Sequence, residues 1–295
     1  MGLSARNPPS AQLVPRAMLS LLLACGTPAA APDPTPSSPE AAVYLPTPTP
    51  AAPTWPAAGA PLQVLPPLSA GARPVRLVID AGHGAPGNSG NTSVRCEAEA
   101  DFTRRVQDEL LARLANAPEL EVRSGRPSAA LLDYGSRIAA FNAWPADAVV
   151  SLHSDARAAD NLSIHPSTGC WSSTGASGFT VLFSDEGPPD LARARRQLAE
   201  AMSRELHGAG FVPYAAGYSE ELYGSIGAGV YVDRHPVGKR IRMLRGTKVP
   251  TVIVETHQAS DAEETARWAE PATLDAFAAA IRRAAVAAAV EGPHG

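Results

Sequence analysis

The sequence predicts an α/β domain in which one sheet is covered by helices on both faces. Short runs rich in valine and isoleucine alternate with longer segments of helical periodicity. Two runs, 148–152 and 251–255, are apolar almost throughout, as expected for strands buried on both faces of a sheet. Hydrophobic residues make up 45% of the 295 residues, which is enough for a sizeable core.

The predicted elements follow one another from residue 73 onward. The β-branched run 75–79 is a strand that ends in a glycine-rich turn. Residues 97–115 carry apolar side chains at helical spacing, and Pro118 closes this helix. After it we expect, in order, strand 120–122, helix 131–143, strand 148–152, a glycine- and serine-rich loop 160–177, strand 178–183, helix 189–207, strand 251–255 and helix 271–290.

Residues 1–25 are typical of an export signal. Arg6 and Arg16 precede an apolar run, 17–24, that stops at Cys25. The run is much shorter than the roughly 20 apolar residues that cross a bilayer, and it fits a signal-peptide core. Leu22-Leu23-Ala24-Cys25 resembles the bacterial lipobox, whose cysteine is lipidated; an ordinary cleaved signal is the alternative. We therefore expect a lipoprotein of the cell envelope, anchored to a membrane through Cys25 on its periplasmic or extracellular side.

Residues 26–72 are rich in proline, alanine, threonine and serine. This composition favours extended conformations and buries no core, so we expect a disordered linker before a catalytic body at 73–291. In an exported protein with a lipidated Cys25, Cys96 and Cys170 remain as a pair. They form either a disulfide or two separate buried thiols. A net charge of −4 without a long basic run argues against nucleic-acid binding.

Four polar residues stand where apolar strands end or a helix begins. His83 follows the first strand, His153 follows 148–152 directly, Glu255 ends 251–255, and Glu97 opens the first helix. Sites in open α/β sheets gather at the carboxyl ends of strands. A lone histidine there is more often structural, but two histidines and a carboxylate form the ligand set of a catalytic zinc site. The second carboxylate, Glu255, suits proton transfer from the attacking water to the leaving amine.

Three motifs in this order resemble those of the zinc-dependent N-acetylmuramoyl-L-alanine amidases of the amidase-3 type. They are Val-Ile-Asp-Ala-Gly-His-Gly at 78–84, Ser-Leu-His-Ser-Asp-Ala at 151–156 and Pro-Thr-Val-Ile-Val-Glu-Thr at 250–256. The resemblance implies a mixed, mostly parallel twisted sheet flanked by helices. It also implies zinc held by His83, Glu97 and His153, with Glu255 as the catalytic carboxylate. Arg126, Arg137 and Asn142 stand where that family carries arginines and an asparagine.

Several positions leave alternatives open. Glu99 rivals Glu97 as the ligand, but Phe102 lies five residues after Glu97, which is the family's spacing, so Glu97 is preferred. Glu99 is then a solvated carboxylate that favours the helix dipole. His257, where the family often has an aromatic residue, either touches substrate or metal or is a local structural variant. His165 is expected on the surface, because three ligands are already supplied.

The resemblance implies hydrolysis of the amide bond between N-acetylmuramic acid and L-alanine in peptidoglycan. The presence of all four polar residues favours an enzyme over a catalytically silent peptidoglycan-binding lipoprotein. An exported zinc peptidase or deacylase acting on another amide is the third possibility, since a fold alone does not define a substrate. An activator protein is a possible further partner, whose identity the sequence does not indicate.

Overall fold

The computed structural model describes residues 54–57, 59–67, 73–127, 132–157 and 161–290. The predicted signal segment, the lipidation site Cys25 and the first part of the predicted linker lie outside these residues. Among the helices in the described ranges, none has the length and apolar character needed to cross a membrane.

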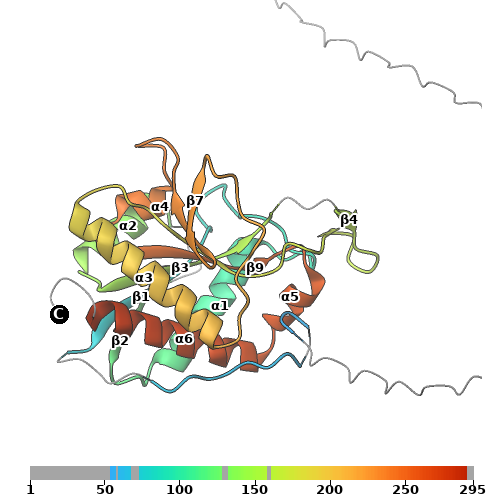
Figure 1. Cartoon of the computed structure of the whole chain (residues 1–295), viewed down its shortest axis with the longest axis horizontal. Coiled ribbons are helices and arrows are strands. Elements are labelled where there is room, and N and C mark those ends of the chain that lie inside the picture. Colours follow the sequence, from blue (N-terminus) through green and yellow to red (C-terminus); the bar gives the residue numbers. More distant parts are fainter. Residues whose placement is uncertain (1–53, 58, 68–72, 128–131, 158–160, 291–295) are drawn as a thin grey trace, which may run out of the picture. The chain divides into compact units, whose positions relative to one another are not determined.

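The described residues form a mixed seven-stranded sheet (Figure 1). In spatial order the strands are β2 (Leu120–Ser124), β1 (Val75–Ala81), β3 (Ala148–Asp155), β9 (Thr251–Gln258), β6 (Thr180–Phe183), β8 (Val230–Asp233) and β7 (Tyr223–Gly227). Parallel pairs join β1 to β2, β1 to β3, β3 to β9 and β6 to β8, and antiparallel pairs join β9 to β6 and β8 to β7. The expected α/β class with a mostly parallel sheet is therefore confirmed.

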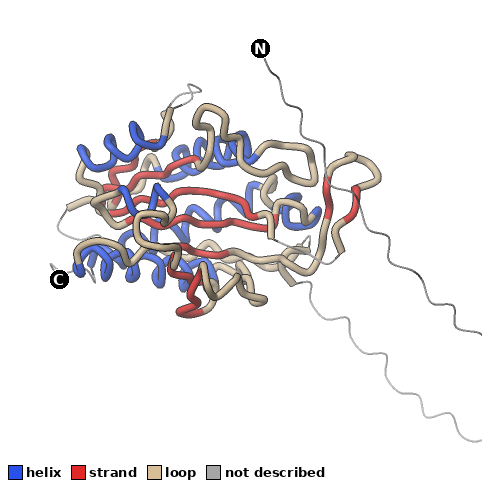
Figure 2. The backbone as a smooth tube through the Cα atoms, turned by 90° about the horizontal axis from the view of Figure 1, so that it is seen from above, coloured by secondary structure: helices blue, strands red, loops and turns tan. Residues whose placement is uncertain are grey.

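Helices cover both faces of this sheet (Figure 2). One face packs on α1 (Glu99–Leu114), α3 (Pro189–Gly208) and α6 (Pro271–Val290) through the larger apolar core. The other packs on α2 (Tyr134–Ala143) and α4 (Arg242–Gly246). Within β1, Leu77 and Ile79 point into the larger core while Val78 points into the smaller one. This alternation explains why the strand reads as a continuous apolar run.

Part of the predicted linker, residues 54–57 and 59–67, packs on the folded body, whereas the sequence placed the start of the body at residue 73. Trp55 is 8% exposed and donates its indole N–H to Oε1 of Glu264 at 2.9 Å. Its ring lies 5.1 Å from that of Phe211, and Gln63 N–H donates to the carbonyl of Ala209 at 3.0 Å. A single large aromatic residue thus anchors a segment whose overall composition indicated no packing.

The predicted loop 160–177 contains a short hairpin, β4 (Ser163–Ile164) and β5 (Trp171–Ser172). A disulfide between Cys96 and Cys170 connects this hairpin to the loop that precedes α1. Of the two alternatives for these cysteines, the structure therefore has the paired one. A further helix, α5 (Ala262–Arg267), follows β9 and was not predicted.

Candidate metal and catalytic site

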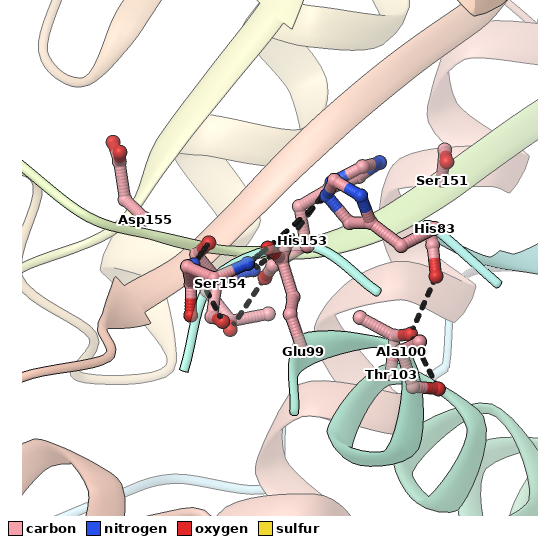
Figure 3. Close-up of polar contacts among 12 residues, drawn as sticks. His83, Glu99, Ala100, Thr103, Ser151, His153, Ser154 and Asp155 are labelled. Atoms are coloured by element: carbon pink, nitrogen blue, oxygen red, sulfur yellow. Dashed lines mark hydrogen bonds and ion pairs between the residues drawn. The ribbon is translucent and has the colours of Figure 1, made fainter. Parts of the chain in front are cut away.

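Three side chains meet at the carboxyl ends of β1 and β3, beside the start of α1 (Figure 3). Glu99, the first residue of α1, places Oε2 3.1 Å from Nε2 of His83 and Oε1 3.0 Å from Nδ1 of His153. One potential ligand atom from each residue lies within 4.8 Å of the others. The two imidazoles are 4.7 Å apart between ring centroids and meet edge to face. Both histidines that the sequence singled out lie in this cluster.

The third member of the cluster is Glu99, whereas the sequence favoured Glu97 as the ligand. Glu97 lies outside the cluster, where its carboxylate pairs with Arg105 at 3.2 Å. The reason is where α1 begins: Ala98 is the N-cap, so Glu99 is the first helical residue and joins its buried face. Glu99 is 3% exposed and lies one turn before Phe102, which is also 3% exposed. It is therefore not the solvated carboxylate expected of a first turn.

Backbone geometry lets the three side chains of the cluster approach one another closely. His83 has a φ of 56°, in the left-handed region that non-glycine residues seldom adopt. Gly90 has a φ of 76°, and a Cβ there would stand 2.5 Å from Oε2 of Glu99 and 2.8 Å from Cδ2 of His83. A side chain at position 90 would therefore displace Glu99 and His83, which the loop between them brings together.

Hydrogen bonds hold His83 and Glu99 in their orientations. Asn88 Oδ1 lies 2.7 Å from Nδ1 of His83, which leaves Nε2 to face Glu99. Tyr134 on α2 accepts a hydrogen bond from Nδ2 of Asn88 at 3.1 Å. Glu99 accepts backbone N–H bonds from Asn91 and from Ser154, both at 3.0 Å. Supporting contacts of this kind fix the ring orientation of metal-binding histidines.

Arg137, one of the residues that the resemblance singled out, supports the loop that carries His83. Its guanidinium is fully buried, bonds Oδ1 of Asp80 at 2.6 Å and donates to the carbonyl of His83 at 2.8 Å. Arg126 donates to the carbonyls of Gly82 and Ala100, which joins this loop to α1. Asn142 instead lies on α2, where it binds the backbone N–H of Lys248 at 2.7 Å.

Glu255 stands next to the cluster in the sheet, as the sequence indicated. In the parallel pairing of β3 and β9 it is the partner of His153, so their side chains leave the sheet on the same side. Its Oε2 atom is buried and has no hydrogen-bond partner among the described residues. Burial, followed by the nearby charges of Asp155 and Glu99, raises the pKa of Glu255 well above its usual range.

The electrostatic environment suits a cation. Burial alone would raise the pKa of Glu99, but hydrogen bonds and charges from His153 and His83 hold it far below its ordinary value. Asp155 is a third carboxylate nearby, and its partners are Arg157 at 2.9 Å and the hydroxyl of Tyr218. Two imidazoles and one carboxylate, with the uncompensated Glu255 beside them, fit the donor set of a catalytic zinc site.

The other two histidines considered from the sequence lie outside the cluster. β9 carries one extra residue between Glu255 and Gln258 relative to β3, and after this bulge His257 points into the larger core. Its ring stacks on Trp268 and lies 4.9 Å from that of Phe102. Burial lowers the pKa of His257 to about 3, so it is a neutral core residue. His165 lies in the turn of the β4–β5 hairpin, where Ser167 is its neighbour.

Comparisons with known proteins agree on the fold and the family. Residues 77–287 match the Amidase_3 family model, described as N-acetylmuramoyl-L-alanine amidase. The solved Ami1 amidases of Mycobacterium abscessus and Mycobacterium smegmatis are 21% and 20% identical, with TM-scores of 0.56 and 0.55. The alignments cover 73% and 72% of this chain and 99% and 95% of those chains.

A third solved structure, an N-acetylmuramoyl-L-alanine amidase from Clostridium difficile 630, is 17% identical with a TM-score of 0.53. That alignment covers 72% of this chain and 95% of the other. At these identities the structural matches establish the shared fold. No curated protein sequence matches the chain.

Proposed function

Since the chain belongs to the N-acetylmuramoyl-L-alanine amidase family, we propose that it hydrolyses peptidoglycan with the help of a zinc ion. Membership of the family makes it an enzyme that cleaves the amide between N-acetylmuramic acid and L-alanine. The observation that carries the zinc proposal is the meeting of His83, Glu99 and His153 within 4.8 Å. These three residues would hold the ion, and Glu255 stands beside them on the neighbouring strand.

Zinc, when bound, supplies positive charge that polarises the scissile carbonyl and acidifies an attacking water. The protein supplies the proton acceptor. Glu255 has a carboxylate oxygen with no partner among the described residues, and it projects on the same side of the sheet as His153. It takes a proton from the attacking water and then gives a proton to the nitrogen of the departing L-alanine. The strand pairing holds Glu255 in place for both transfers.

The chain is also proposed to be a membrane-anchored lipoprotein of the cell envelope, with its lipid on Cys25. The apolar run that ends at this cysteine supports the proposal, and the disulfide between Cys96 and Cys170 is consistent with an oxidising compartment. The test is partitioning of the full chain and of Cys25→Ser between detergent and water after expression in a bacterium. The parent should enter the detergent phase and the variant should not; a variant that stays with detergent contradicts the lipid anchor.

The deciding experiment for the activity is product analysis on purified peptidoglycan. An amidase releases stem peptides with a free L-alanine amino terminus and leaves the glycan strands intact. Removal of the metal by a chelator should abolish the release, and added zinc should restore it. Binding to peptidoglycan without release would favour a silent binding protein, whereas cleavage at a different amide would identify another zinc hydrolase.

A further inference from the structure

The β4–β5 hairpin displays an apolar face to solvent. Ile164 and Trp171 are direct cross-strand partners, so their side chains lie on the same face of the hairpin. Leu162 comes just before β4 and lines one groove with Trp171. The exposed fractions of Ile164, Trp171 and Leu162 are 54%, 56% and 53% respectively. Figure 1 shows the hairpin standing out from the body, beyond β9 and near α5. An exposed apolar cluster of this kind indicates a binding surface.

The hairpin is held firmly against the loop that leads into the metal cluster. The disulfide joins Cys170 to Cys96, three residues before the ligand Glu99. Thr168 donates its hydroxyl to the carbonyl of Val94 at 2.7 Å, and Ser173 N–H donates to the carbonyl of Ser260 at 2.9 Å. The exposed aromatic side chain of Trp171 is therefore carried by a fixed element rather than by a loose loop.

Between the hairpin and the body lies an open groove of about 570 Å³. Its lining residues include Asn91, Thr92, Leu162, Trp171, Gln258 and Ser260. Asn91 belongs both to the groove and to the metal cluster, because its backbone N–H binds Oε2 of Glu99 and its side chain binds the carbonyl of Ser154. Asn91 thus links the lining of the groove to the cluster, and the groove extends from Asn91 toward the hairpin.

The lining favours an uncharged ligand with one flat apolar face. Amide and hydroxyl groups accompany the Trp171 indole, which is a suitable platform for the C–H face of a pyranose ring. The charged residue that also lines the groove is Arg157. Its Nε binds Asp155 at 2.9 Å and its Nη1 donates to the carbonyls of Ala176 and Gly178, while the buried Nη2 has no partner among the described residues. A stem peptide carries carboxylates and an amine, whereas the N-acetylated sugars of the glycan are neutral.

We propose that this groove is a saccharide subsite, in which Trp171 stacks against a neutral N-acetyl sugar of the glycan strand. The proposal rests on the proposed function, because the substrate there is a polymer whose sugars continue beyond the bond that is cleaved. Trp171 then selects substrates whose glycan strand extends past the reacting muramic acid. The disulfide fixes the spacing between this subsite and the cluster.

The test compares two substrates that contain the same scissile amide. One is a peptidoglycan fragment of several disaccharide units, and the other is a muramoyl peptide without neighbouring sugars. The ratio of their kcat/KM values should fall roughly tenfold in Trp171→Ala, since aromatic contacts contribute on the order of one factor of ten. Trp171→Phe should keep most of the preference for the longer fragment. Val237→Ala changes a valine that is 78% exposed and outside the groove, and this variant should have the same ratio of kcat/KM values as the parent.

Equal losses on both substrates in Trp171→Ala would overturn the proposal, because the hairpin would then support the reaction centre instead. A direct binding measurement separates this result from failure of the proposed function. Calorimetry with a chain of four N-acetylglucosamine units should show binding to the parent and roughly tenfold weaker binding to Trp171→Ala, even if neither cleaves an amide. No binding by the parent, or displacement of the sugars by a free stem peptide, would also overturn the subsite.

Discussion

Glu99 presents Oε1 to Nδ1 of His153 at 3.0 Å, across 54 positions of sequence. The same carboxylate faces His83 with its other oxygen, at 3.1 Å. Glu97, two residues earlier, points to Arg105 instead. The position at which α1 begins thus decides which of the two glutamates joins the cluster. Replacing each glutamate in turn tests whether Glu99 is the metal ligand.

Glu99→Gln should lower zinc affinity strongly, while Glu97→Gln should leave it unchanged. The amide keeps the size of the side chain but removes the negative charge that a cation needs, and it leaves two of three ligands. Zinc content after dialysis against a weak chelator, measured by elemental analysis, distinguishes the variants. Equal zinc retention by both would exclude Glu99 as a ligand, and loss in Glu97→Gln alone would restore the original assignment.

Glu255→Gln should retain zinc and the fold while turnover falls by at least about 10²-fold, the lower end of the range for a general acid–base group. The amide cannot accept the proton of the attacking water. Turnover is measured as the release of stem peptides with a free L-alanine amino terminus, together with zinc content and thermal unfolding. A folded, zinc-loaded Gln variant with near-normal turnover would remove Glu255 from the mechanism.

Five of the seven strands of the main sheet and the long helices were predictable because each follows one local period, whereas β7, β8, α4 and α5 were not predicted. Glu99 was also within reach of this reasoning: counting back along the buried face of α1 from Val106 through Thr103 and Phe102 leads to position 99, not 97. The family spacing was preferred over the helix's own period, and it led to Glu97, which lies outside the cluster. His83, His153 and Glu255 were found because each lies at or near the carboxyl end of a recognisable strand.

The features that the sequence did not indicate depend on long-range contacts. β4 and β5 have two residues each, too few to show any period. The packing of Trp55 on Glu264 joins residues 209 positions apart, and the proline-rich segment around Trp55 has no apolar periodicity. Asp155 and Tyr218 likewise meet only through the tertiary fold.

Asn88→Ala should weaken zinc binding by about 10- to 100-fold, the usual effect of losing a residue that orients a metal-binding histidine. An alanine at position 88 lacks the side-chain oxygen that binds Nδ1 of His83, so the imidazole loses the hydrogen bond that orients it. Competition with a chromogenic chelator measures the affinity. Asn161→Ala, at an exposed asparagine outside the cluster, is the control. Unchanged affinity in Asn88→Ala would mean that the loop alone orients the ring.

Replacing Cys96 and Cys170 together by serine should destabilise the oxidised protein by roughly 4 kcal/mol, because the disulfide closes a long loop in the unfolded chain. The two cysteines are separated by 74 positions. Denaturant unfolding of the parent and the double variant, with and without reductant, measures the difference. The difference in unfolding free energy between the two proteins should disappear when the parent is reduced. A difference that persists under reductant would indicate that lost packing, rather than the missing cross-link, destabilises the variant.

Glu264 should make the stability of the fold depend on pH. Burial raises the pKa of this carboxyl to about 7, although Trp55 and the backbone N–H groups of Gln258 and Gly178 donate to it. Because the folded state then binds the proton more tightly than the unfolded state, the stabilising contribution of protonation is complete below about pH 4.5 and disappears as pH rises through 7.

The matched variant is Glu264→Gln, which cannot ionise. The unfolding free energy of the parent relative to this variant should fall by roughly 3 kcal/mol between pH 4.5 and pH 8, since each pKa unit corresponds to about 1.4 kcal/mol. Taking the difference between the two proteins cancels the titration of groups that they share. Denaturant unfolding of both proteins at several pH values measures this difference in unfolding free energy. A difference that stays constant would show that the three donors to the carboxylate offset the cost of burying its charge, and that Glu264 is ionised throughout.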